Sequence, residues 1–155
     1  MKKFLLYGTL SLGGLFLLIQ LVPVNRTNPP ITGEIQVPLA VKKILKTSCY
    51  DCHSNETRWP WYSYVAPISW LVAYDVKEGR RELNFSVWQT YTTKRKKKKF
   101  KEIWEEIAKG KMPMGVYLLT HKEAKMDTAK ATQIKAWTEQ ETKALSDEKH
   151  PKTGK

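Results

Sequence analysis

Cysteine and histidine are scarce in this chain, which has two cysteines and three histidines among 155 residues. The two cysteines, Cys49 and Cys52, lie close together and leave no further thiols for a disulfide framework. The remaining histidines, His121 and His150, stand alone. A structural zinc site usually combines two pairs of Cys or His ligands, so the sequence gives little support for one.

Long hydrophobic runs are also rare, and the one that stands out lies at the N-terminus. Residues 4–24 are apolar apart from three polar positions, and two lysines precede them. About 20 apolar residues suffice to cross a bilayer, and flanking lysines favour the cytoplasmic side. We therefore predict a single-pass anchor in the cell membrane, with the soluble domain on the periplasmic or extracytoplasmic side.

A cleavable signal peptide is the alternative interpretation of this segment. Its apolar core is usually shorter and ends in a small-x-small site. No convincing Ala-x-Ala precedes the polar stretch, and no cysteine is present there for lipid attachment. The pattern favours an uncleaved anchor, and both interpretations place the domain outside the cytoplasm.

The two cysteines belong to the most informative pattern in the chain, Cys49-Tyr50-Asp51-Cys52-His53. It reads C-x-x-C-H, the attachment signature of a c-type haem. The two thiols add across the porphyrin vinyl groups, and the adjacent imidazole binds the iron. We predict one covalent haem c, with His53 as a metal ligand. A thioredoxin-like motif also reads C-x-x-C, but it needs a βαβ context that is not visible here.

A c-type haem iron usually takes a second axial ligand, and Met112 is the best candidate. It follows Gly110 and precedes Pro113, whose ring fixes φ and biases the preceding residue towards an extended backbone. Met114 and His121 are alternatives, and Met112 as core filler is the structural alternative. His/Met ligation raises the reduction potential, whereas bis-His ligation lowers it.

Six tryptophans are many for so small a chain. Trp59 and Trp61 follow the attachment motif closely, and we predict that they contact the porphyrin. Trp104 and Trp137 lie on amphipathic patterns and are expected to be ordinary core residues. Arg58 either pairs with a propionate or faces solvent.

The hydrophobic periodicity predicts an all-α soluble part with no convincing strand pair. The first helix is expected near Pro38, the second over 67–81, the third from Thr93 or Lys94 to a positive-φ Gly110, and the fourth after Asp127. The segment 83–88 is too short for its secondary structure to be predicted. The resulting organisation is an anchor (1–24), a linker (25–37), a haem-binding domain (38–145) and a polar tail (146–155).

Basic residues outnumber acidic ones by 27 to 15, which gives a net charge of +12. Such a balance raises the question of nucleic acid, but the export segment argues against it. An acidic redox partner protein or anionic lipid headgroups fit better, and both attractions weaken as salt rises. Six of the basic residues form the run 94–99. This run is either simply solvated, or docks an acidic partner, or touches the membrane surface near the anchor.

Several segments besides the attachment motif carry a resemblance to a known family: R-W-P-W-Y (58–62), P-I-S-W (67–70), L-N-F-S-V-W (83–88) and G-K-M-P (110–113). Together they resemble the small bacterial haem-binding domain proteins of the cytochrome c type. The resemblance implies a class I-like, all-α cytochrome c fold, with Cys49 and Cys52 as thioether sites, His53 as proximal ligand and Met112 as distal ligand. The family pattern usually continues with a second proline, where this chain has Met114.

The expected function is that of a membrane-anchored monohaem c-type cytochrome that transfers single electrons outside the cytoplasmic membrane. A six-coordinate iron leaves no room for a substrate, which favours a carrier over an enzyme. A haem-based sensor or ligand-binding module with an open or weakly held distal position is the alternative. A thiol oxidoreductase is a third hypothesis.

Overall fold

The computed structural model describes residues 1–147, and the secondary structure in that range is entirely helical, which confirms the all-α prediction. The α-helices are α1 (Lys2–Ile19), α2 (Leu39–Ser48), α3 (Tyr50–His53), α4 (Ile68–Glu82), α5 (Thr93–Ala108), α6 (Gly115–Leu118) and α7 (Thr128–Asp147). Three short 3₁₀ helices join them: η1 (Trp61–Tyr64), η2 (Phe85–Thr90) and η3 (Lys122–Ala124).

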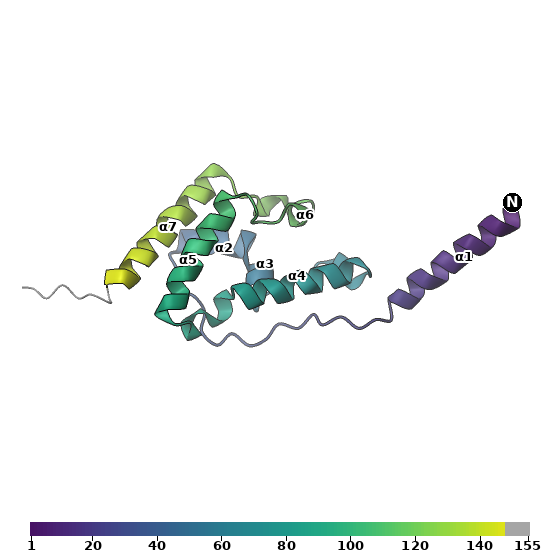
Figure 1. The fold of residues 1–155 in the computed structure, drawn as a ribbon, viewed down its shortest axis with the longest axis horizontal. Helices are drawn as coiled ribbons and strands as arrows, with labels where there is room; N and C mark the ends of the chain where they lie inside the picture. The colour runs from purple at the N-terminus through teal and green to yellow at the C-terminus, as the bar shows by residue number, and fades with distance from the viewer. Residues whose placement is uncertain (148–155) are drawn as a thin grey trace, which may run out of the picture.

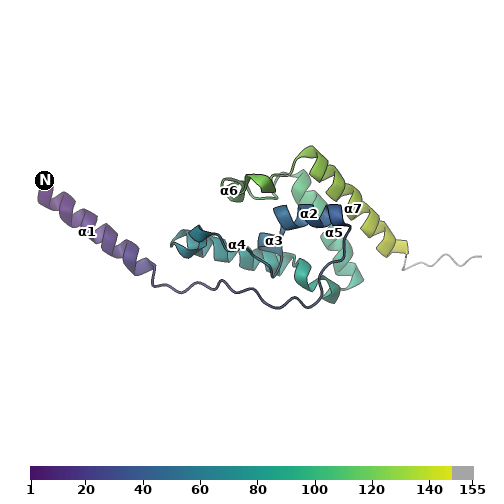
Figure 2. The ribbon, with the colours of Figure 1, turned by 180° about the vertical axis from the view of Figure 1, so that it is seen from behind.

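Helix α1 stands apart from the rest of the molecule (Figures 1 and 2). None of its residues is buried, and its mean hydropathy is 1.4. Its 18 residues would span about 27 Å, close to the thickness of a bilayer core of about 30 Å. By length and composition it is able to cross a membrane, although a signal sequence meets the same criteria.

The main core lies where α5 and α7 pack side by side in opposite directions (Figure 1). Phe100 and Ile103 on α5 meet Ile134 and Trp137 on α7, and the rings of Phe100 and Trp137 form an edge-to-face pair 5.2 Å apart. Helices α2 and η2 close this core with further buried side chains, Val41, Ile44, Leu45, Phe85 and Trp88. Helix α4 lies on the other side of α3, so that α3 sits between two layers of helices (Figure 2).

The helix starts that the sequence predicts are confirmed. Pro38 is the N-cap of α2, and α4 begins one residue after Pro67. Helix α5 begins at Thr93, and the Asp127 carboxylate accepts a hydrogen bond from the Lys130 N–H (2.8 Å) at the start of α7. A proline marks the starts of α2 and α4 to within one residue, and an N-cap side chain marks the start of α7.

The segment 25–37 lacks regular structure, as the sequence predicts, yet it is attached to the domain along its length. Asn28 Nδ2 donates to the Thr57 carbonyl (3.0 Å), and the Gly33 N–H donates to the Ser86 carbonyl (3.0 Å). Ile35 is only 2% exposed and belongs to the core. We call this segment the strap. The predicted division into domains stays a prediction.

The predicted polar tail overlaps the end of α7, because Ser146 and Asp147 are its last residues. The remainder of the tail, with His150, lies outside the described residues.

Candidate functional site

The attachment motif forms a single helical turn, α3, wedged between α2 and α4. The Cys52 and His53 N–H groups both donate to the Cys49 carbonyl, at 3.2 and 2.9 Å. Tyr50 is 1% exposed and stacks on Phe85 with ring centroids 5.3 Å apart, which fixes the turn to the core. One turn thus brings both thiols and the imidazole to the same place.

His53 has a fixed orientation because its ring is held by the C-terminal end of α4. Nδ1 lies 2.9 Å from the Gly79 carbonyl oxygen and 3.1 Å from that of Leu83. Carbonyls only accept, so Nδ1 carries the proton and Nε2 keeps its lone pair. Desolvation lowers the pKa of His53 and favours the neutral ring. A neutral imidazole with one nitrogen held by backbone carbonyls is the usual form of a metal-ligating histidine.

Gly79 makes this arrangement possible. A Cβ at this position would lie 2.6 Å from the Cys52 carbonyl oxygen and 3.1 Å from Cys52 Cβ. Only a residue without a side chain lets α4 approach α3 so closely. Sequence reasoning did not single out Gly79, because its role depends on a neighbour 27 positions away in the chain.

Two adjoining cavities open beside the motif, with volumes of about 190 and 420 Å³. Four residues line both of them: Cys49, His53, Glu82 and Met112. We call the two together the cleft.

Met112 reaches the cleft from the loop after α5. That helix ends at Ala108, and Gly110 has a φ of 67°, which confirms the predicted positive-φ position. The Met112 N–H donates to the Glu106 carbonyl (3.2 Å), and the peptide bond to Pro113 is cis.

The two alternative distal ligands differ in position. Met114 lines the smaller cavity of the cleft and also a third cavity of about 370 Å³. His121 lines only this third cavity, and its ring stacks on Tyr117 with centroids 4.1 Å apart. The structure thus brings Met112 and Met114 to cavities that His53 lines, and it places His121 behind Tyr117.

A neutral histidine with a free nitrogen, a thioether and two adjacent thiols therefore converge on one cleft, and this donor set fits a haem. A family model described as a haem-binding domain matches residues 14–140. The chain belongs to this haem-binding domain family. No curated protein and no solved structure matches the chain. The match extends from the second half of α1 to α7, so it includes the strap as well as the cleft.

The two tryptophans expected at the haem of this haem-binding domain lie outside the cleft lining. Trp59 lines a separate cavity beside the strap, together with Trp70, and its indole nitrogen is buried without a partner. Trp61 is 78% exposed and lines the third cavity together with Cys52. Their contact with a porphyrin stays a prediction. Trp104 and Trp137 lie on α5 and α7, and Trp137 is a core residue, as expected.

Asp51 inside the motif links the attachment turn to the methionine loop. Asp51 is 8% exposed, and its carboxylate accepts hydrogen bonds from Tyr117 Oη (2.8 Å) and from Arg58 Nε and Nη2 (both 3.2 Å). Burial, together with the hydrogen bond to Asp51, raises the pKa of Tyr117. Tyr117 follows Met112 and Met114 and lines the cleft as well. Arg58 is thus engaged by Asp51, and nothing in the C-x-x-C-H spacing could have identified this contact.

The two thiols are poorly suited to thiol redox chemistry in the haem-free protein. Burial raises the pKa of Cys49 to about 12 and that of Cys52 to about 11. Reactive cysteines need a lowered pKa, so the environment argues against a thiol oxidoreductase. Within residues 1–147, no three His, Cys, Asp or Glu side chains are grouped to hold a metal ion.

Proposed function

We propose that this haem-binding domain is a membrane-anchored monohaem c-type cytochrome that carries single electrons outside the cytoplasmic membrane. The observation that carries the proposal is the His53 ring, whose Nδ1 is held by two backbone carbonyls beside a C-x-x-C turn. A thioredoxin-like use of the motif would not require that arrangement. The finer fold assignment, a class I-like cytochrome c fold, belongs to the same proposal.

Each residue of the cleft has a defined part in holding the group. Cys49 and Cys52 would hold it through two thioether bonds, and His53 and Met112 would hold its iron through a nitrogen and a sulfur. When bound, the haem contributes an iron that accepts and releases one electron. The protein tunes that iron through its axial ligands and through burial, and a methionine ligand raises the reduction potential.

With His53 and Met112 both holding the iron, no coordination site would be left for a substrate, which favours a carrier over an enzyme. Met112 supports this choice because the loop that carries it is tied down. Glu106 holds its backbone, and the Asp51–Tyr117 hydrogen bond anchors the following turn. A sensor would instead need a distal residue that yields its place to a small ligand.

The proposed location follows from α1, in which two lysines precede the apolar run. Lysines at the start of such a helix favour the cytoplasmic side, which places the domain outside. Thioether attachment of haem normally takes place on that side.

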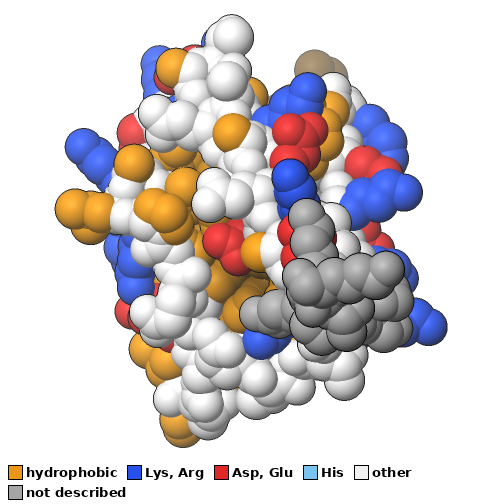
Figure 3. All heavy atoms as spheres, turned by 90° about the vertical axis from the view of Figure 1, so that its left-hand side faces the viewer, with side chains coloured by type: hydrophobic (Ala, Val, Ile, Leu, Met, Phe, Trp, Pro, Cys, Tyr) orange, Lys and Arg blue, Asp and Glu red, His pale blue; other side chains and the backbone are white. Residues whose placement is uncertain are grey.

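The proposed partner is an acidic redox protein that docks on the basic run of α5. Lys94, Arg95 and Lys98 of this run are exposed, and Lys99 at its end lines the larger cavity of the cleft. At the end of the molecule opposite α1, lysine and arginine side chains lie mainly toward the edges, interspersed with acidic ones, and hydrophobic side chains line a hollow nearer the middle (Figure 3). A partner held there by long-range attraction would lie beside the cofactor, and its association would slow as salt rises.

The proposal is tested by a pyridine haemochrome spectrum and an intact mass of the chain purified from its native host. We expect one covalently bound haem and a chain that retains α1. Cys52→Ala should weaken or abolish covalent attachment. Colourless, folded protein without added mass would refute the proposal.

A second spectrum separates the carrier from the sensor. The oxidised protein should be low-spin and should show the weak far-red band of an iron–methionine bond. A high-spin protein that reacts readily with carbon monoxide would support a sensor or a peroxidase-like enzyme instead.

A further inference from the structure

A long uncharged, aromatic segment lies between the attachment motif and the charged half of α4. The 16 residues 59–74 contain no charged side chain, three tryptophans and three tyrosines. Many of their large side chains are exposed, which is unusual in a soluble domain of this size. The exposed ones are Trp61 (78%), Tyr64 (59%), Ile68 (48%), Trp70 (37%), Leu71 (50%) and Tyr74 (61%). We call this segment the aromatic platform.

Hydrogen bonds hold the aromatic platform next to the end of α1. Gln20 is the residue that follows α1, and its side-chain amide pairs with both backbone groups of Ala66. The distances are 3.2 Å to the Ala66 carbonyl and 2.8 Å from the Ala66 N–H. Arg26 adds a bond to the Ser63 carbonyl (3.2 Å), and its guanidinium lies 4.4 Å from the centre of the Tyr64 ring. The platform thus lies at the level where an inserted α1 leaves the bilayer.

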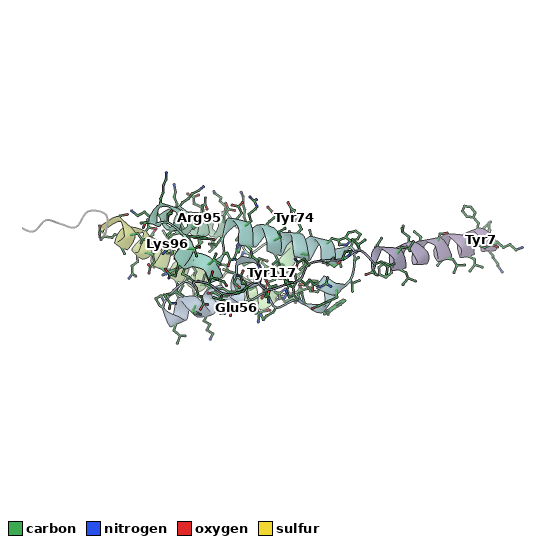
Figure 4. All side chains as sticks on the ribbon, turned by 90° about the horizontal axis from the view of Figure 1, so that it is seen from below. Tyr7, Glu56, Tyr74, Arg95, Lys96 and Tyr117 are labelled. Atoms are coloured by element: carbon green, nitrogen blue, oxygen red, sulfur yellow. The ribbon has the colours of Figure 1, made fainter. Side chains whose placement is uncertain are left out.

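The polarity of α4 changes along its length in the direction that this position requires. Its first seven residues, 68–74, carry no charge, whereas six of the eight residues 75–82 are charged. The basic run lies further still from α1, as the positions of Arg95, Lys96 and Tyr7 show (Figure 4). Apolar and aromatic surface is therefore concentrated at the end of the domain that faces α1.

We propose that the aromatic platform docks the haem-binding domain onto the surface of the membrane in which α1 is inserted. Tryptophan and tyrosine favour the headgroup region, since their rings are apolar and their N–H and O–H groups remain hydrated there. An apolar helical face typically settles about 5–10 Å deep in this zone. The inference rests on the proposed membrane anchor, but it does not depend on electron transfer.

Fluorescence quenching by brominated lipid tests this docking directly. Helix α1 contains no tryptophan, and all six tryptophans of the chain lie in the soluble part. Any quenching by bromine confined to the bilayer therefore reports contact of the domain itself. The full-length chain is reconstituted into phosphatidylcholine vesicles, either plain or brominated near the headgroups, and vesicle flotation confirms insertion. The intensity ratio between the two vesicle types cancels the quenching by haem.

We expect clear quenching for the wild type and a fall of roughly half in the quenched share for Trp61→Phe, because Trp61 and Trp70 are the two tryptophans exposed on the platform. Trp104→Phe is the matched control, since Trp104 lies on α5. It should leave the quenched intensity unchanged. Leu71→Glu, which places a charge on the platform, should reduce quenching while the haem absorbance stays the same.

Three results would overturn the inference. A chain that floats with the vesicles but shows no bromine quenching would be anchored without docking. Equal effects of Trp61→Phe and Trp104→Phe would show that the platform is not the contact, as when a protein partner or a second copy covers it. A chain that does not float with the vesicles would show that α1 does not insert, and the docking inference would fail with it. The proposed haem would still be tested separately by its spectrum.

Discussion

Replacement of Gly79 by alanine is the sharpest test of how the attachment turn is held. This change has two effects on the stability of the fold, and they act in opposite directions. Alanine is better than glycine inside a helix by about 1 kcal/mol, which alone would stabilise α4. The added Cβ, however, would lie 2.6 Å from the Cys52 carbonyl oxygen, about 0.8 Å closer than ordinary contact allows.

The loss of stability that we predict depends on which contacts change when α4 moves away from α3. A retreat of about 0.8 Å by α4 would stretch the His53–Gly79 hydrogen bond from 2.9 Å to beyond the range of a real hydrogen bond. Overpacking of this kind costs about 1–3 kcal/mol, and a weakened hydrogen bond to a buried group costs a further 1 kcal/mol or so. These losses exceed the gain in helix propensity, so we expect a net destabilisation of about 1–3 kcal/mol.

Urea unfolding of the haem-loaded protein measures this change, with circular dichroism as the signal. Gly115→Ala is the matched control, because a Cβ there meets no atom within 4 Å. It should be neutral or slightly stabilising. A Gly79→Ala protein as stable as the control variant would refute the close approach of α4 and α3.

Three further predictions concern the cleft. Met112→Ala should keep the covalent haem, lower the reduction potential and make the iron accessible to added ligands, whereas Met114→Ala should leave the spectrum unchanged; the reverse pattern would exchange their roles. Asp51→Asn should destabilise the fold by about 1–3 kcal/mol in thermal unfolding, because it weakens a charged hydrogen-bond network; an unchanged melting temperature would contradict this. The raised pKa values of Cys49 and Cys52 keep both thiols protonated at neutral pH. Alkylation of the haem-free chain near pH 8 should therefore be at least about 100-fold slower than that of a free thiol. Equal rates would support the thiol oxidoreductase hypothesis instead.

The parts of this structure that depend on local chemistry were predictable from the sequence. The apolar positions of α5 repeat at helical spacing, and Asp127 caps the next long helix, so both elements were found close to their observed limits. The positive φ at Gly110 followed from its place after an amphipathic run. Family membership was also predictable, because the quoted motifs are short and contiguous.

The parts that depend on distant contacts were not predictable. Gly79 and Asp51 act through neighbours 27 and 66 positions away, and no periodic pattern records such a contact. Ile35 follows a segment rich in proline and other turn-forming residues, so no hydrophobic pattern around it predicts that it is buried in the core. The short helices η2 and α6 have too few residues for a pattern to repeat.

The strap has a consequence for how far the domain can travel. Thirteen residues behaving as a free coil would let it sweep a radius of about 20 Å around its tether. Here, backbone hydrogen bonds from the strap to Ser86 and Phe85, and the burial of Ile35 in the core, prevent this free movement. If the domain is the proposed electron carrier, it therefore cannot move freely around its anchor between a donor and an acceptor. Its rate of electron transfer should then depend on how often partner molecules reach it by diffusion, and a longer tether should not raise that rate while the strap stays bound.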